Sequence, residues 1–231
     1  MREMFSRIAP RYDFLNHLLS FSLDRIWRRN TARRFRHILA RTDARVLDLC
    51  CGTGDLTLAL WKEGKRSTGK CPRIMGSDFA HPMLCLARRK YSEVGPQQYI
   101  EADALKLPFP EGSFDLVTAA FGFRNLANYE VGLCEILRVL KPGGEAGILE
   151  FTEPQSALVR PIYHFYLRRI VPQVGGAISG SYAAYSYLPV SVSKFPSAEE
   201  LAVLMKKCGF AEARFELWTM GTVALHSGRK S

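Results

Sequence analysis

Residues 46–55, with the sequence VLDLCCGTGD, constrain the fold of this chain more than any other segment. The apolar start of the run predicts a buried strand, and Gly52 and Gly54 follow at its end. Glycines in this place let the backbone turn sharply and approach a ligand closely, because they lack a β-carbon. The run therefore predicts an α/β sheet that binds a small molecule at the carboxyl ends of its strands.

The chain after residue 44 alternates between short apolar runs and longer amphipathic segments. This alternation is typical of strands joined by crossover helices, which form a mostly parallel sheet with helices on both faces. A helix over residues 129–140 is predicted to end at KPGG, and the turn at Gly221 fits a closing antiparallel pair. The expected strands are residues 45–49, 73–77, 98–101, 114–120, 145–151, 213–217 and 222–227.

The 231 residues suit a single domain with four parts. Residues 1–40 are expected to form a helical lid, since Trp27, Thr31, Phe35 and Ile38 recur at helix spacing. The other expected parts are a ligand-binding core at 45–151, an inserted lid at 152–196, and a closing helix with two strands at 197–231.

Three local patterns refine this division. Residues 62–70, which are basic and contain Gly and Ser, predict a solvent loop. Residues 152–196 predict a helix rich in aromatic residues, followed by a Gly/Ser/Tyr loop that extends from Gly175 to Tyr187. Ser197 and Glu200 have the spacing of a capping box, which predicts that a helix begins there.

The formal charge of +10, from 32 Lys and Arg against 22 Asp and Glu, indicates an anionic partner or surface. The basic residues are densest at positions 25–36, which fits either a solvated face or a membrane-facing one. No stretch approaches the roughly 20 apolar residues that span a bilayer, and no apolar signal core follows Met1. We expect a cytoplasmic protein, with structural cysteines and no metal site.

The acidic residues around the glycine turn indicate which kind of cofactor it binds. A dinucleotide site needs a third glycine where this chain has Thr57, and Asp48 and Asp55 place negative charge where a pyrophosphate would bind. S-adenosylmethionine carries a sulfonium and an ammonium and has no phosphate, so it suits these carboxylates on Coulomb grounds. The turn therefore predicts an S-adenosylmethionine site that includes Asp48, Gly52, Thr53 and Gly54.

Further acidic residues follow the second and third predicted strands. Asp78 is placed to accept hydrogen bonds from both ribose hydroxyls. Asp103 can accept from the adenine amino group, while Ala104 presents a backbone amide to the ring. A single Asp at a strand end is more often a turn or helix cap. Their recurrence at three consecutive strand ends makes the cofactor assignment specific.

The chain resembles the class I methyltransferases in VLDLCCGTGD, EADALKLPFPEGSFD and EILRVLKPGG. It further resembles the quinone biosynthesis C-methyltransferases, which act on demethylmenaquinol and its benzoquinol counterpart. Four segments carry this likeness, in order along the chain: MFSRIAPRYDFLNHLLSFSLDRIWRR, FGFRN, AYSYLPVSVSKFP and GTVALHSGRK. The resemblance implies a Rossmann-like, seven-stranded sheet whose last strand is antiparallel, and cofactor contacts at Thr53, Asp78, Asp103 and Ala104. The chain departs from the family pattern at Ala120, where a cofactor-proximal Ser is usual, and at Ser22, where Gly is usual.

The reaction that the resemblance implies is methyl transfer to a ring carbon of a polyprenylated hydroquinone, with demethylmenaquinol as the expected substrate. Arg124 and Asn125 match the family's functional pair, and Arg124 is expected to stabilise the phenolate because a guanidinium stays protonated. Asn125 would orient the ring. Tyr12 and Asn16 are expected to complete the pocket, Tyr12 by bonding a quinol oxygen, although both would also suit helix packing. The basic N-terminal helix and the aromatic lid are expected to contact the membrane that holds such a quinol.

Several alternatives stay open. The acceptor could be the benzoquinol of ubiquinone biosynthesis or the phytyl-naphthoquinol of phylloquinone biosynthesis, and the sequence does not decide between a monomer and a homodimer. An RNA methyltransferase would also be basic, but this chain contains no NPPY, DPPY or Pro-Cys motif, so we expect no nucleic-acid partner. A catalytically inactive scaffold with this fold is the remaining rival.

Overall fold

The computed structural model describes residues 13–70, 72–93, 95, 98–179 and 182–231. Its central feature is a sheet of seven strands in the order β3-β2-β1-β4-β5-β7-β6. Strands β1 to β5 are parallel, whereas β7 is antiparallel to both of its neighbours. The predicted fold class is therefore confirmed. The strands are β1 (Arg45–Leu49), β2 (Arg73–Asp78), β3 (Gln98–Glu101), β4 (Phe114–Ala120), β5 (Leu140–Phe151), β6 (Phe210–Trp218) and β7 (Val223–Lys230).

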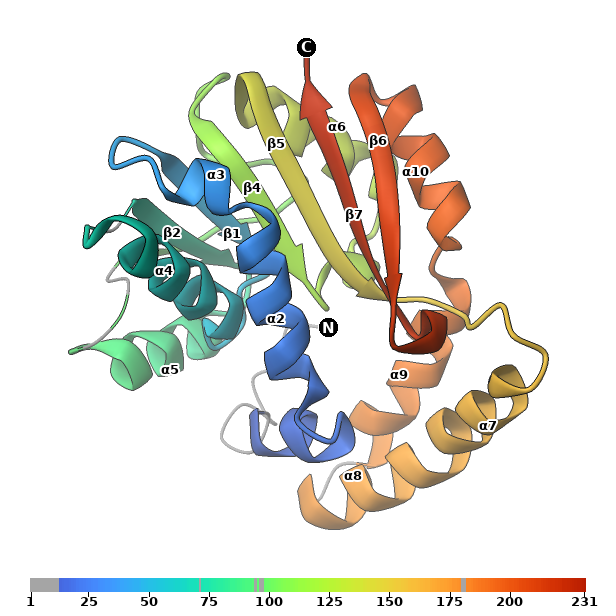
Figure 1. The fold of residues 1–231 in the computed structure, drawn as a ribbon. Helices are drawn as coiled ribbons and strands as arrows, with labels where there is room; N and C mark the ends of the chain where they lie inside the picture. Colours follow the sequence, from blue (N-terminus) through green and yellow to red (C-terminus); the bar gives the residue numbers. More distant parts are fainter. Residues whose placement is uncertain (1–12, 71, 94, 96–97, 180–181) are drawn as a thin grey trace.

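Helices cover both faces of the sheet (Figure 1). Successive strand residues point to opposite faces, so Val46 and Leu116 pack with the helices in front, while Leu47 and Val117 pack with those behind. The front helices include α2 (Leu23–Arg34), α3 (Arg36–Leu39) and α4 (Asp55–Thr68). Helices α6 (Tyr129–Val139) and α10 (Ala198–Lys207) contribute to the rear core. Helix α5 (His81–Tyr91) connects β2 to β3 in sequence. Helix α10 begins with the predicted capping box between Ser197 and Glu200.

The N-terminal helices are anchored to the sheet by buried side chains. Trp27, Thr31, Phe35 and Ile38 are all buried, as their spacing predicts. The Phe35 ring lies directly over Gly147 on β5, where an added β-carbon would come within 2.4 Å of the ring. This close contact fixes where the N-terminal segment crosses the sheet.

The prediction of a solvent loop at residues 62–70 was wrong. Helix α4 continues to Thr68 and ends at Gly69, whose φ of 71° is the left-handed conformation that closes many helices. The buried carboxylate of Glu63 accepts hydrogen bonds from Arg36 at 2.6 Å and from Arg66 at 2.8 Å. These ion pairs, which the local composition does not reveal, stabilise the extra turns of the helix.

The predicted Gly/Ser/Tyr loop within residues 152–196 was also wrong. The segment forms α7 (Val159–Phe165), a π-helical turn at Tyr166–Ile170, α8 (Val171–Ser179) and α9 (Tyr182–Lys194), while Gly180 lies outside the described residues. Leu167 and Val171 are buried with Leu15 in a small core that joins this segment to the N-terminal helix of residues 13–19. Burial of apolar faces therefore outweighs the weak helix propensity of glycine and Pro189.

Candidate active site

The glycine turn after β1 has an unusual backbone. Cys50, Gly52 and Gly54 have positive φ angles of 50°, 54° and 84°. Asp78 Oδ2 accepts the Gly52 amide at 2.9 Å, and Asp78 Oδ1 accepts the Ala80 amide at 2.8 Å. The carboxylate at the end of β2 therefore holds the turn against the start of the next helix. A β-carbon at Gly54 would come within 2.9 Å of the Tyr99 hydroxyl, so this position also needs glycine for space.

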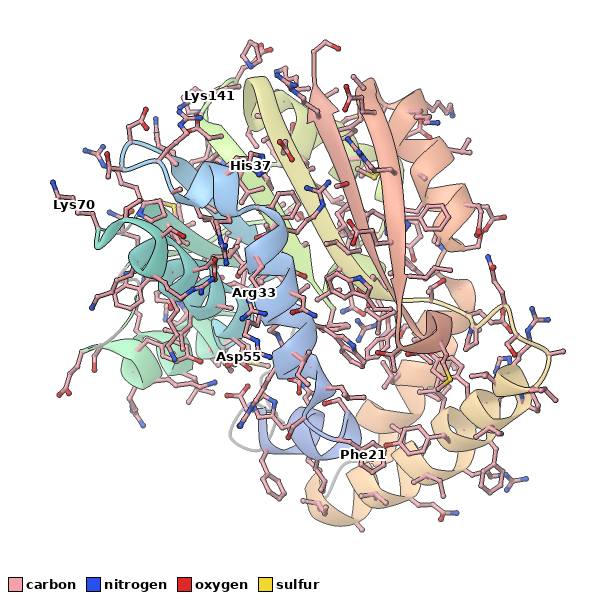
Figure 2. The ribbon with its side chains drawn as sticks, in the orientation of Figure 1. Phe21, Arg33, His37, Asp55, Lys70 and Lys141 are labelled. Atoms are coloured by element: carbon pink, nitrogen blue, oxygen red, sulfur yellow. The ribbon has the colours of Figure 1, made fainter. Side chains whose placement is uncertain are left out.

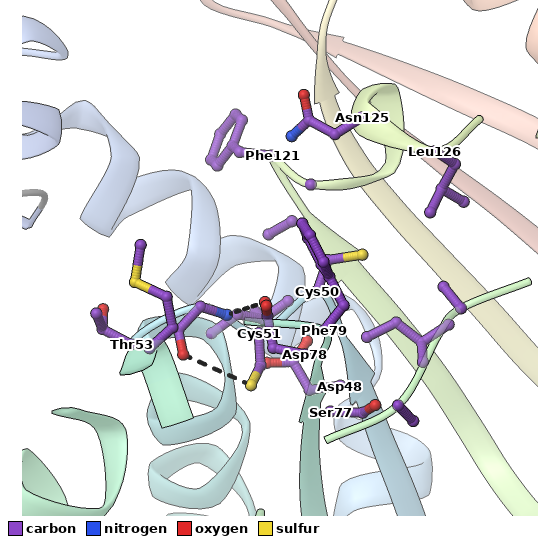
Figure 3. Close-up of a pocket in the computed structure, with 18 of the residues that line it drawn as sticks. Asp48, Cys50, Cys51, Thr53, Ser77, Asp78, Phe79, Phe121, Asn125 and Leu126 are labelled. Atoms are coloured by element: carbon purple, nitrogen blue, oxygen red, sulfur yellow. Dashed lines mark hydrogen bonds between the residues drawn. The ribbon is translucent and has the colours of Figure 1, made fainter. Parts of the chain in front are cut away.

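A cavity of about 640 Å³ runs across the carboxyl ends of β3, β2, β1 and β4. Figure 3 draws residues that line it, among them Asp48, Thr53 and Asp78. Nearly all of the residues predicted for the cofactor line it. Gly54 is not among the lining residues, because it lies behind the turn against Tyr99 and Tyr91. Those that line it are Asp48, Gly52, Thr53, Asp78, Asp103 and Ala104, together with Asn125 and Ala120.

The carboxylates at this cavity have distinct environments. Asp48 is fully buried and accepts hydrogen bonds from Thr57 at 2.6 Å and Thr118 at 2.9 Å, yet burial raises its pKa to about 7. Burial likewise raises the pKa of Asp78. For Asp55, burial opposes ionisation, but nearby Arg28 and Lys90 outweigh it and lower the pKa to about 2. The cavity thus combines fixed negative charge with a carboxyl that a bound cation would ionise.

The N-terminal segment is tied to the glycine turn by Asp13. One oxygen of its carboxylate accepts a hydrogen bond from the Thr53 hydroxyl, and the other lies 2.7 Å from Lys90 Nζ. Lys90 also lies 2.6 Å from Asp55 Oδ1. These contacts connect residues before α2 with the cofactor turn and with α5. Tyr12, the neighbour of Asp13, lies outside the described residues.

A second cavity of about 230 Å³ lies beside the first. Its lining is mostly apolar and comes from α2, the helix of residues 13–19, the ends of β4 and β5, and the segment of α7 to α9. Asn16 and Trp27 line it, as does Arg124. Arg28 and Phe121 line both cavities, so they form the wall between them. The polar lining residues also include Ser20, Asp24, Thr219 and Thr222, and the remaining lining residues are Leu19, Phe21, Leu23, Phe151, Tyr163, Tyr166, Leu167, Val171 and Leu188.

Arg124 and Asn125 follow β4 on a short 3-10 turn, and the two side chains serve different cavities. Arg124 is buried: its Nη1 donates to Glu150 at 2.7 Å and to the Phe121 carbonyl, and its Nε donates to Ser191 at 3.3 Å. Asn125 Oδ1 is buried and has no hydrogen-bond partner among the described residues. A buried oxygen of this kind normally has a partner, so Asn125 is ready to accept a hydrogen bond from a ligand.

Comparisons with known proteins agree with this geometry. A model of the ubiE/COQ5 methyltransferase family matches residues 1–230. The chain belongs to this family. A demethylmenaquinone methyltransferase from Thermus thermophilus is 50% identical over 226 residues, which cover 97% of this chain and 99% of that protein. The ubiquinone/menaquinone biosynthesis C-methyltransferase UbiE from Geobacter sulfurreducens is 45% identical over 233 residues, covering 100% of this chain and 88% of that protein.

A solved structure from Thermotoga maritima supports the fold of this ubiE/COQ5 family member. It is a SAM-dependent methyltransferase described as a possible histamine N-methyltransferase, with a TM-score of 0.68, 20% identity and complete coverage of both chains. Dependence on S-adenosylmethionine, predicted from the glycine turn, is confirmed by the family. The cavity fits this cofactor because carboxylates surround the space where the sulfonium and ammonium would lie.

Sequence reasoning missed two residues of this ubiE/COQ5 site. Arg28 was predicted to belong to a solvated or membrane-facing basic stretch, whereas its side chain is only 12% exposed and lines both cavities. The signal was Asp24, four residues earlier and on the same helix face. Glu150, which is fully buried, lies within the predicted strand at 145–151. A charged residue in the apolar run GILEF was the signal, because a buried charge requires a partner.

Proposed function

We propose that this chain transfers a methyl group from S-adenosylmethionine to a ring carbon of a polyprenylated hydroquinone, with demethylmenaquinol as substrate and menaquinol as product. The observation that carries this proposal is the pair of adjoining cavities with opposite chemical character. The acid-lined cavity suits a cationic cofactor, and the apolar one suits an isoprenoid quinol. Relatives named demethylmenaquinone methyltransferase support the naphthoquinol ring.

The cofactor is assigned along the edge of the sheet. Asp103 and the Ala104 amide would contact the adenine, and Asp78 would accept from the ribose hydroxyls with the lone pairs that its two backbone contacts leave free. Asp48 and the turn at Gly52 would then face the methionyl part. When bound, S-adenosylmethionine supplies an activated methyl group on a sulfonium.

Arg124 and Asn125 would prepare the quinol ring. Methylation at carbon requires a ring hydroxyl, with a pKa near ~10, to lose its proton. Nε and Nη1 of Arg124 are engaged, and Nη2 has no hydrogen bond to the described residues, so it is left for a quinol oxygen. Its hydrogen bond would stabilise the phenolate while water takes the proton. Asn125, which lines the cofactor cavity, would accept from a hydroxyl of a ring that reaches into that cavity for the methyl group, and so orient the ring. Tyr12 stays a predicted further contact.

We also propose that the mouth of the apolar cavity rests on a membrane surface. Two groups of exposed apolar residues belong to segments that line it: Phe14, Leu18 and Phe21 before α2, and Leu158, Ile162 and Phe165 around α7. Phe21 is 77% exposed, projects from the lower end of the molecule (Figure 2), and its ring lies 6.0 Å from that of Tyr166 at the cavity. Arg160, Arg168 and Arg169 on the same segment are exposed and would attract anionic lipids. No helix of the described residues has the length and apolar character to cross a bilayer.

A methyl-transfer assay tests the proposed reaction. Purified protein and labelled S-adenosylmethionine are incubated with short-chain demethylmenaquinol, the demethoxybenzoquinol analogue, a phytyl-naphthoquinol or RNA. We expect the highest kcat/KM with demethylmenaquinol and a large loss in Arg124→Ala. Preference for another quinol would replace the assigned ring. Methylation of RNA alone, or cofactor binding without turnover of any acceptor, would overturn the proposal.

Vesicle binding tests the membrane surface. We expect the protein to sediment with vesicles that contain phosphatidylglycerol at low salt and to be released at high salt. Phe21→Ser combined with Phe165→Ser should weaken binding, whereas Val203→Ser, at an exposed apolar residue on the distant α10, should not. Equal binding by both variants would contradict the assigned surface.

A further inference from the structure

The larger cavity holds a single positive side chain among the described residues that line it. Six acidic residues face the cavity, namely Asp13, Asp48, Asp55, Asp78, Glu101 and Asp103. Arg28, from the middle of α2, is the only described lining residue with a positive charge. A helix that covers the sheet thus places one guanidinium among these carboxylates.

The surroundings of Arg28 hold its side chain in place. Its Nη1 pairs with Asp24, one turn earlier on α2, and its guanidinium lies 5.3 Å from the centre of the Phe121 ring. Asp24 is itself buried and accepts hydrogen bonds from Ser20 at 2.8 Å and His17 at 2.7 Å. Asp24 is the only hydrogen-bond partner of the guanidinium among the described residues, and it uses Nη1, so Nε and Nη2 of Arg28 make no hydrogen bond to them. The part of the guanidinium that Asp24 does not use is therefore available to a ligand.

Arg28 lies at the end of the cavity away from β3 and β2. Asp78 ends β2 and Asp103 follows β3, on the side assigned to the adenosine. Arg28 instead lies near Asp55 and near Phe121, which directly follows β4. Burial opposes the ionised form of Asp55, and the charge of Arg28 makes the largest contribution among those that lower the pKa of Asp55. The methionyl end of the cofactor, with its ammonium and carboxylate, would lie among these groups.

We propose that Arg28 binds the α-carboxylate of S-adenosylmethionine, with Asp24 as the positioning residue that orients the guanidinium. The inference rests on the cofactor of the proposed function and is independent of the quinol. The planar guanidinium fork matches a carboxylate in geometry and charge. Six surrounding acidic groups would repel an isolated anion. The methionyl group also carries an ammonium, whose attraction to these carboxylates offsets the repulsion of its carboxylate.

Isothermal titration with two cofactor forms tests this assignment without any methyl acceptor. Decarboxylated S-adenosylmethionine lacks only the carboxylate, so it is the matched probe. Wild-type protein should bind S-adenosylmethionine about 10 to 100 times more tightly than the decarboxylated form, the range for a charge-assisted hydrogen bond. Arg28→Gln should lose that factor for S-adenosylmethionine, leave the affinity for the decarboxylated form unchanged, and so abolish the preference. Arg29→Gln, at an exposed neighbour on α2, should keep it.

Two results would overturn the proposal. An equal loss of affinity for both probes would mean that Arg28 only supports the structure. If Arg28→Gln still preferred S-adenosylmethionine to the decarboxylated form by the same factor, Arg28 would not bind the carboxylate and would be assigned to the apolar cavity, which it also lines. If Arg28→Gln does not fold because Asp24 loses its partner, the double variant Asp24→Asn/Arg28→Gln removes both charges, and the same preference is measured there. Failure of the quinol assay would leave these binding results unaffected.

Discussion

Nη1 of Arg124 lies 2.7 Å from Oε1 of Glu150, and the two side chains are 8% and 0% exposed. Glu150 also accepts the backbone amides of Arg124 at 3.2 Å and Phe151 at 2.9 Å, so β5 determines how the guanidinium is oriented. From the sequence alone, Arg124 is expected to stabilise the phenolate as a protonated guanidinium, without any indication of a partner. In the structure the charge of Arg124 is neutralised by that of Glu150. We therefore assign the stabilisation of the phenolate to a directed hydrogen bond from Arg124 to the ring oxygen, and not to a long-range effect of its positive charge.

Glu150→Ala should destabilise the protein strongly. Removal of the carboxylate leaves the buried guanidinium of Arg124 without its partner, which typically costs about 3–5 kcal/mol. Urea denaturation measures this loss. Glu153→Ala is the matched control, since Glu153 Oε1 lies 2.7 Å from His164 Nε2 but the Glu153 side chain is 53% exposed, and its loss should cost no more than about 1 kcal/mol. Similar losses in both variants would show that the Arg124–Glu150 pair contributes little.

Binding of S-adenosylmethionine should strengthen as the pH rises from 6 to 8. Burial raises the pKa of Asp48 from 3.8 to about 7, and a bound cation favours the ionised carboxylate. If binding requires that form, the affinity should increase about tenfold over this interval. Titrations at several pH values measure it, and Asp48→Asn should remove this dependence. The same slope in Asp48→Asn would assign the effect to another group.

The same carboxyl should affect the stability of the cofactor-free protein in the opposite sense. Between pH 3.8 and about 7 the folded protein retains a proton on Asp48 that the unfolded chain has lost. The folded state then binds more protons, so this contribution to the free energy of unfolding falls as the pH rises through that window. Denaturation of wild type and Asp48→Asn at pH 5 and pH 8 measures it, and the variant is expected to gain stability relative to wild type at the higher pH. A constant difference between the two proteins would contradict the raised pKa.

Much of the sheet and of the cofactor site can be predicted from the sequence because short-range patterns determine them. The strands at 98–101 and 114–120 have the predicted bounds, since an apolar run ends in a clear turn at each. Asp48, Asp78 and Asp103 meet at one cavity because parallel strands bring their carboxyl ends to the same edge.

Other features depend on contacts between distant parts of the chain. Arg28 belongs to a basic stretch whose composition suggests a surface, and only the packing of α2 on the sheet brings it into the cavity. The glycines of α8 suggest a loop, but Leu15, more than 150 residues away from Val171 in the chain, buries the apolar side of the segment. Local propensity cannot include such contacts, which is why these predictions failed.

Gly147→Ala should test how closely α2 and α3 pack on the sheet. The new β-carbon would come within 2.4 Å of the Phe35 ring, which is fully buried and has little room to move. Overpacking of this kind costs about 1–3 kcal/mol, measurable as a lower midpoint in thermal or urea unfolding. The double variant Gly147→Ala/Phe35→Leu should recover part of the loss, and no recovery would mean that the ring is not the obstacle.

Leu188→Trp should separate the roles of the two cavities. Leu188 on α9 lines the apolar cavity and does not line the cofactor cavity. A larger side chain there would occupy space assigned to the quinol without reaching the cofactor turn. We expect the KM for a prenylated quinol to rise about tenfold or more, while the affinity for S-adenosylmethionine measured by titration stays constant. Val190→Trp, two residues later and 47% exposed, controls for the effect of tryptophan on α9. A loss of cofactor affinity in Leu188→Trp comparable to its effect on the quinol would mean that the two cavities do not divide the substrates as proposed.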